Sequence, residues 1–165
     1  MSENLSPWLD PRWRQQTRLI LNSYRHWLGK EFIPHLASDE EQAHILFEAP
    51  FVVVSHGTQA DPVLNYANRT ALTLWEMDLP TFLKTPSRLT AEPVHRDERA
   101  RLLERTTRNG YVDDYSGIRI SRTGKRFRID QAIVWNLIDG DERYAGQAAT
   151  FSHWTELPSQ AEVSA

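Results

Sequence analysis

Cysteine is absent from the 165 residues of the chain, and this absence excludes several kinds of chemistry. Without a thiol there is no disulfide, iron–sulfur cluster, cysteine zinc site, thiolate nucleophile or cysteine-linked chromophore. No uninterrupted apolar run is longer than four residues, the length of Phe51 to Val54, whereas a membrane helix needs about 20 apolar residues. The N-terminus also lacks the basic and apolar segments of a secretory signal. We therefore expect a cytoplasmic protein with no membrane partner.

An excess of positive charge is also missing, because the formal net charge is -3. A nucleic-acid-binding domain is usually strongly basic. Two segments are nevertheless locally basic, since residues 12–30 and 119–128 each contain five Lys or Arg and no acid. Such runs are more often solvated faces than binding sites. Nucleic-acid binding is therefore the third of three functions that we consider.

The composition is that of one globular domain. Hydrophobic residues make up 40% of the chain and charged residues 25%. A length of 165 residues suits a single core, which typically fills with roughly 100 to 200 residues. We divide the chain into an N-terminal helix and linker over 1–37, a domain over 38–157, and a flexible tail over 158–165.

An amphipathic helix is predicted between Asp10 and Gly29. Asp10 before Pro11 is typical of a helix start, and Gly29 is typical of a helix end. Aromatic and apolar residues then recur at spacings of three and four, which places them on one face. This face either packs on its own domain or forms the seam of a homodimer. The homodimer seam would consist of Trp13, Ile20, Tyr24 and Trp27.

The rest of the chain has the pattern of an α+β fold. Ser38 and Glu41 fit a capping box that opens a short helix ending near Glu48. Two further helices are predicted over residues 69–77 and 97–109. Strands are predicted over residues 51–56, 63–67, 111–121, 126–138 and 143–154.

The long strand over 126–138 has one apolar face. Strict alternation places five side chains on that face, namely Phe127, Ile129, Ile133, Trp135 and Leu137. Asn136 then lies on the opposite, wet face. Gln131 also falls on the apolar face, where an unpaired amide would cost about 1 to 3 kcal/mol. Either Gln131 meets a partner, water or ligand, or a bulge turns it outward.

Several segments of the sequence resemble the MEKHLA domain family between about residues 38 and 151. They are Ala49 to Gly57, Asn65 to Leu72, Tyr115 to Ser121, Val134 to Asn136 and Gly146 to Phe151. The element order resembles that of a PAS domain. The resemblance implies a stand-alone bacterial-type member with a five-stranded antiparallel sheet, helices on one face, and a sensing or interaction role. It supplies no catalytic residues.

A PAS-like fold would hold a ligand between the sheet and its helices. The candidates for contacting it are Trp75, Arg88, His95, Gln131, Trp135 and Gln147. The two tryptophans either pack in the core or stack on a planar ligand. Gln147 stands between Ala145 and Ala149, whose small side chains leave room for a ligand or for a bulky neighbour.

The two remaining candidates lie near a proline-rich loop. Arg88 either grips an anion or forms a salt bridge that holds the loop. His95 either ligates a haem or is a hydrogen-bonding residue near a helix start. The cofactor, if one exists, is a small molecule held without a covalent link. The six histidines show no paired spacing typical of a metal site.

The leading hypothesis is therefore a non-enzymatic sensory domain that binds a small ligand or a protein partner and signals through dimer or partner contacts. The alternative is a small α+β enzyme that uses His56 or His95 as its base. Ser55 and His56 do not form a nucleophile and base pair, because adjacent strand residues point to opposite faces.

Overall fold

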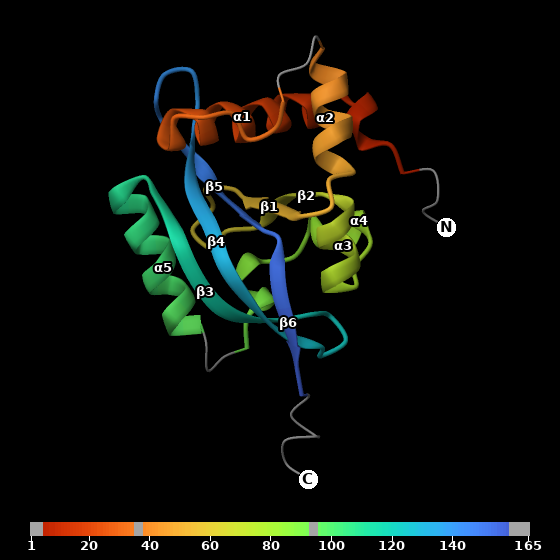
Figure 1. The fold of residues 1–165 in the computed structure, drawn as a ribbon, viewed down its shortest axis with the longest axis vertical. Coiled ribbons are helices and arrows are strands. Elements are labelled where there is room, and N and C mark those ends of the chain that lie inside the picture. Colours follow the sequence, from red (N-terminus) through yellow and green to blue (C-terminus); the bar gives the residue numbers. More distant parts are fainter. Residues whose placement is uncertain (1–4, 35–37, 93–95, 159–165) are drawn as a thin grey trace.

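An antiparallel sheet forms the centre of the computed structural model, which describes residues 5–34, 38–92 and 96–158 (Figure 1). The strand order is β2-β1-β5-β4-β3, and β6 pairs with β4. The strands are β1 (Val52–His56), β2 (Leu64–Ala67), β3 (Tyr111–Ile120), β4 (Arg126–Ile138), β5 (Tyr144–Phe151) and β6 (His153–Leu157). The predicted α+β fold with an antiparallel sheet is confirmed, although its last strand is divided at Ser152 and the sheet has six strands instead of five.

One face of the sheet is covered by the helices between β2 and β3. They are α3 (Arg69–Trp75), α4 (Leu79–Phe82), the 3-10 helix η2 (Ser87–Thr90) and α5 (Arg96–Asn109). Helix α5 lies along β3 and β4, whereas α3 packs on β1 (Figure 1). Asp97 and Glu98 in the first turn of α5 and Arg108 in its last turn match the helix dipole.

The N-terminal helix covers the opposite face. The 3-10 helix η1 (Pro7–Leu9) precedes α1 (Pro11–Leu28), and α2 (Asp39–Phe47) packs on both. The predicted caps are confirmed: Asp10 accepts from the amide of Arg12 at 2.8 Å, and Gly29 ends α1 with a φ of 73°. Ser38 caps α2 by accepting from the amide of Glu41 at 3.1 Å.

The aromatic face of α1 packs on its own sheet and not on a second copy. Trp13, Ile20 and Tyr24 are buried. The Trp135 ring meets that of Tyr24 edge-on at 5.1 Å, and its indole Nε1 donates to the Ile20 carbonyl at 3.3 Å. Trp27 Nε1 donates to the Asn136 carbonyl at 2.9 Å. The predicted homodimer seam of Trp13, Ile20, Tyr24 and Trp27 is therefore wrong, because these side chains are used within the chain.

A bulge at Gln131 changes the alternation along β4. Tyr115 pairs with Ala132 and Gly117 with Ile129, so two residues of β4 oppose one residue of β3. Gln131 has a φ of 54° and is exposed. β4 pairs with β6 before this bulge and with β5 after it, which explains the division of the predicted last strand.

The bulge exchanges the faces of the residues that follow it. Phe127 and Ile129 face α3 to α5, as do Ala132, Val134 and Asn136, whereas Trp135 faces α1. The predictions that Trp135 faces the pocket and that Asn136 lies on a wet face are therefore wrong. The alternative in which a bulge turns Gln131 outward is confirmed.

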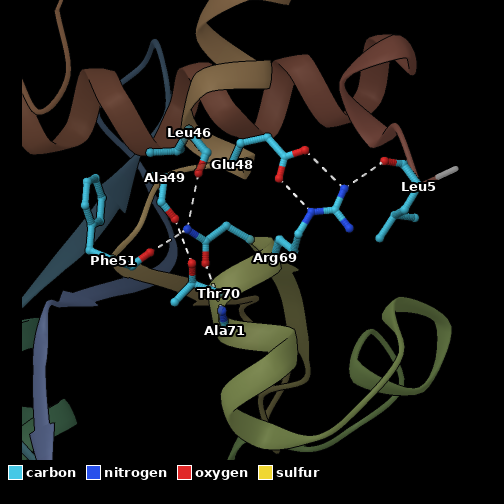
Figure 2. A network of polar contacts seen from close by, with 9 residues as sticks. Leu5, Leu46, Glu48, Ala49, Phe51, Arg69, Thr70 and Ala71 are labelled. Carbon is cyan, nitrogen blue, oxygen red and sulfur yellow. Dashed lines mark hydrogen bonds and ion pairs between the residues drawn. The ribbon is translucent and has the colours of Figure 1, made fainter. Parts of the chain in front are cut away.

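The side chain of Asn68 joins three elements at the start of α3. Its Oδ1 accepts from the amides of Val53 and Ala71, at 3.1 and 3.2 Å. Its Nδ2 donates to the carbonyls of Leu46 and Phe51, at 3.2 and 2.7 Å (Figure 2). Asn68 is fully buried, so its own side-chain amide has no water as a substitute partner.

The polar network extends to the surface through the next two residues of α3. Thr70 donates to the Ala49 carbonyl at 2.7 Å, and Arg69 bonds both carboxylate oxygens of Glu48, at 2.6 and 3.1 Å (Figure 2). Arg69 also donates to the Leu5 carbonyl at 3.3 Å. α3 is thereby fixed to α2 and to the N-terminal segment.

We expect Asn68→Ala to lower the free energy of unfolding by about 2 to 4 kcal/mol, because it removes a helix cap and leaves buried groups unpaired. Urea unfolding followed by circular dichroism measures this. Asn68→Asp keeps the acceptor but places a carboxylate against two carbonyls, so it should destabilise as well. Thr73→Ala, at an exposed site on the same helix, is the control. An Asn68→Ala protein as stable as this control would contradict the role assigned to the amide.

Candidate functional site

A cavity of about 80 Å³ lies between the sheet and helices α3 to α5. Its walls are mostly apolar, with side chains contributed by β1, β2, all three long strands and the helices. The apolar lining includes Leu64, Trp75, Phe82, Leu102, Val134 and Phe151. Polar side chains also reach the cavity, and they occupy two places in its wall.

The first polar group is a row across three strands. His56 of β1 is paired in register with Gln147 of β5, which is paired in turn with Asn136 of β4. All three residues are buried. Gly146 makes this close pairing possible, because a Cβ there would lie 2.1 Å from the His56 carbonyl oxygen. The row thus depends on a glycine with a φ of 124°.

The amide of Gln147 is oriented by three acceptors. The two N–H groups of its Nε2 are shared among the Leu103 carbonyl at 3.0 Å, Thr107 Oγ1 at 2.9 Å and Asn136 Oδ1 at 3.0 Å. The Nε2 atom therefore faces α5 and β4. Gln147 Oε1 is buried and has no hydrogen-bond partner.

Asn136 connects the polar row to both faces of the sheet. Its Nδ2 donates to the carbonyls of Thr106 and Thr107, at 3.1 and 3.2 Å, near the end of α5. Its backbone amide donates to the Gly110 carbonyl at 2.9 Å. Its backbone carbonyl accepts from Trp27 of α1. One residue thus holds α5, β5 and α1 together.

His56 presents an unpartnered nitrogen to the cavity. Its Nδ1 lies 2.9 Å from the Gly57 carbonyl oxygen, which accepts only, so Nδ1 carries the proton in the neutral ring. Nε2 is then an acceptor, and it is buried without a partner. Burial lowers the pKa of His56, and the charge of Arg99 lowers it further. The hydrogen bond to Gly57 acts in the opposite direction, as does the nearby Gln147 side chain, whose Oε1 accepts only from the protonated ring.

The second polar group contains two buried arginines, Arg99 of α5 and Arg119 of β3, both of which line the cavity. Arg99 donates to Ser87 Oγ, and Arg119 donates to the Ile118 carbonyl at 2.9 Å. The Arg119 guanidinium lies 5.4 Å from the centre of the Tyr115 ring. Burial, followed by the charge of Arg119, lowers the pKa of Arg99 to about 10.

The structure brings two of the six predicted ligand residues to the cavity. Trp75 and Gln147 line it, and Trp75 Nε1 is buried without a hydrogen-bond partner. Trp135 and Gln131 lie away from it. Arg88 forms an exposed ion pair with Asp61 at 3.2 Å. That contact is the salt bridge proposed as its alternative role.

The two predictions on histidine have different outcomes. His95 lies outside the described residues. His56, predicted as the base of an alternative enzyme, lines the cavity, whereas Ser55 bonds Gln16 of α1 on the other face. The described residues contain no group of three or more His, Cys, Asp or Glu that could hold a metal ion. None of the described helices has the length and apolarity of a membrane span.

Sequence reasoning missed the two buried arginines. Arg119 follows Tyr115 and Gly117 at alternate positions of β3, and Arg99 precedes Leu102 by three residues on α5. These spacings are the signal that would have placed both side chains on inward faces. We grouped Arg119 with a basic segment instead of following its strand face.

The fold is that of a PAS domain. The chain is similar to a PAS domain from Colwellia psychrerythraea, with a TM-score of 0.58 and 11% identity over 72% of this chain and 95% of that one. It is similar to an RNA-binding Light-Oxygen-Voltage receptor, with a TM-score of 0.59 and 14% identity over 81% of this chain and 37% of that one. It is also similar to a LOV domain from the Erythrobacter litoralis EL346 blue-light-activated histidine kinase. That match has a TM-score of 0.51 and 16% identity over 67% of this chain and 98% of that one.

Within this class, the chain belongs to the MEKHLA domain family, whose model matches residues 14–156. The match therefore includes most of α1. Homeobox-leucine zipper protein HOX29 of Oryza sativa subsp. indica is 28% identical over 155 residues, which is 89% of this chain. Homeobox-leucine zipper protein HOX10 of the same subspecies is 25% identical over 140 residues, which is 84% of this chain. The chain spans 17% of the length of each of these relatives.

The lowered pKa of His56 predicts a pH dependence of stability. The unfolded chain takes up a proton near the ordinary pKa of about 6.5, but the folded chain does so only at lower pH. Stability contributed by neutral His56 is therefore complete above pH 6.5 and is lost as the pH falls toward the folded pKa. We expect His56→Gln to show a smaller loss of unfolding free energy than the wild type between pH 7.5 and 5.5. Equal losses in urea titrations would contradict this assignment.

Proposed function

We propose that this chain is a non-enzymatic PAS-like sensory domain that binds a small molecule in the cavity between the sheet and α3 to α5. The observation that carries the proposal is a set of three buried polar atoms in residues that line the cavity, none with a hydrogen-bond partner. They are His56 Nε2, Trp75 Nε1 and Gln147 Oε1. An unpaired buried polar group costs about 1 to 3 kcal/mol, so a ligand that pairs them binds with a clear gain.

The size of the cavity supports a small ligand. A cavity of about 80 Å³ is roughly half of the 150 Å³ cavity that accepts benzene, and pockets for drug-sized ligands have about 300 to 1,000 Å³. One structural neighbour is described in connection with a flavin analogue. A flavin or haem ring does not fit a space of this size, and the absence of cysteine excludes a cysteinyl adduct.

The surroundings of His56 favour binding over catalysis. Its Nδ1 bonds a backbone carbonyl, and no acid or hydroxyl bonds the ring among the described residues. A general base that activates a hydroxyl needs that hydroxyl within hydrogen-bond reach. The neighbouring Ser55 bonds Asn65 Oδ1 at 2.5 Å on the α1 face instead. An enzyme with His56 as its base would need such a partner, and the described residues bonded to the ring do not supply one.

Strand β4 connects the cavity to α1 and is therefore the element through which we expect a signal to pass. Ala132 and Val134 line the cavity and Asn136 bonds α5 on the same face, whereas Trp135 between them contacts α1. A displacement of β4 by a ligand reaches α1 through Trp135 and through the bond from Trp27 to the Asn136 carbonyl. We propose that the exposed side of α1 is where a partner detects the bound state.

We expect a ligand to shift the indole N–H resonance of Trp75 and to raise the melting temperature. Nuclear magnetic resonance titration with small polar compounds, together with native mass spectrometry of the protein as purified, measures this. At a ligand concentration 100 times Kd the stabilisation is about 2.7 kcal/mol.

The matched variant is Ala149→Leu, which fills the cavity because Ala149 lines it opposite Val54 and Val134. We expect this variant to stay folded and to lose both ligand effects. Ala100→Leu adds the same volume at an exposed position of α5 and should behave as the wild type. Equal responses of the Ala149→Leu variant and the wild type would place binding elsewhere.

A further inference from the structure

Two buried positive charges in one cavity wall are unusual, since buried arginines are generally paired with an acid. Arg99 and Arg119 are only 9% and 7% exposed. Among the described residues, no carboxylate lies within 4 Å of either guanidinium as an ion pair. The charge of Arg119 lowers the pKa of Arg99, so the two groups are close enough to repel each other.

The carboxylates in this region bond other groups. Asp61 pairs with Arg88 at 3.2 Å, and Glu92 pairs with Arg126 at 2.8 Å. Glu98 accepts from the Tyr115 hydroxyl at 3.2 Å. These acids thus bond other groups, and among the described residues neither cavity arginine has a carboxylate at ion-pair distance, although the charge of Asp61 acts on Arg99 from further away. A bound anion would supply a counter-ion at that distance.

The other polar part of the wall needs a donor. His56 Nε2 and Gln147 Oε1 are both unpaired acceptors in residues that face each other in register. His56, Gln147, Arg99 and Arg119 all line the same cavity. A ligand with an acid group at one end and a hydroxyl at the other would satisfy both.

We infer that the ligand is a small hydroxycarboxylate, held with its acid group at Arg99 and Arg119 and its hydroxyl at His56 and Gln147. This inference rests on the proposed function and names the chemical class of its ligand. The apolar remainder of the wall, with Leu64, Phe82 and Val134, favours a carboxylate on a short carbon chain over inorganic phosphate. The cavity volume of about 80 Å³ limits that chain to a few atoms.

Glycolate is the probe, and acetate, glycolamide and inorganic phosphate are the matched compounds. Acetate lacks the hydroxyl, glycolamide lacks the charge, and phosphate lacks the carbon chain. The Trp75 indole resonance and the melting temperature are followed for each compound at constant ionic strength. We expect glycolate to bind at least about tenfold more tightly than each of the other three.

Arg99→Met and Arg119→Met test the two arginines separately. We expect each to weaken glycolate binding at least about tenfold, since each removes charged hydrogen bonds to the acid group. Arg119→Met should also raise the melting temperature of the free protein, because it removes an unpaired buried charge. Arg119→Lys keeps the charge but not the planar fork. Its affinity for glycolate should therefore lie between those of the wild type and Arg119→Met.

The control is Arg101→Met, which makes the same change of charge at an exposed position of α5 and should leave binding within about twofold. If glycolamide bound as tightly as glycolate, the claim that the ligand is an anion would be wrong, although the cavity would remain a ligand site. Acetate binding as tightly as glycolate would overturn the hydroxyl assignment. Tighter binding of phosphate than of glycolate would overturn the assignment of the acid group as a carboxylate. No response of Trp75 to any of the four compounds would overturn this inference, and a retained response to other small polar compounds would preserve the proposed function.

Discussion

The bulge at Gln131 is the constraint on which both faces of the sheet depend. A left-handed backbone at a residue other than glycine costs of order 1 to 2 kcal/mol. In return, the side chains after the bulge change faces, so that Trp135 reaches α1 and Asn136 reaches α5. Without that change, an indole would fill the cavity and a buried amide would face the apolar side of α1. The bulge therefore determines both the cavity and the packing of the N-terminal helix.

The cavity combines two polar groups with opposite requirements. Arg99 and Arg119 are donors without a counter-ion, whereas His56 and Gln147 present acceptors without a donor. Both arrangements reduce the stability of the empty protein, since unpaired polar groups and like charges are costly when buried. Such groups are retained in ligand sites because the same cost becomes affinity when the ligand pairs them. The asymmetry of the wall would also give the proposed ligand one orientation.

Local signals in the sequence were sufficient for most of the fold. The caps at Asp10, Ser38 and Gly29 were readable because capping depends on a few adjacent residues. Trp75 was named as a candidate for the pocket, and it lines the cavity. Trp135 was misplaced because strict alternation continues only where every strand residue is paired. The polar Gln131 on an apolar face suggested a bulge, but the faces of the residues after it were still assigned by strict alternation.

The site was less predictable than the fold for a related reason. Arg99 and Arg119 are 20 residues apart in sequence, and only the packing of α5 on β3 brings both into one wall. A charged residue in a basic segment is usually solvated, so composition pointed to the surface. The aromatic face of α1 was ambiguous because the same spacing suits a sheet and a second helix. Tertiary packing decides such cases.

The hydrogen bonds of Asn136 couple the local unfolding of the elements that they join. Its side chain, amide and carbonyl bond α5, the turn at Gly110 and Trp27 of α1, while Gln147 bonds its Oδ1. Separation of any one of these elements leaves buried groups of the others unpaired. We therefore expect the last turns of α1 and α5 to exchange their amide hydrogens as one cooperative unit.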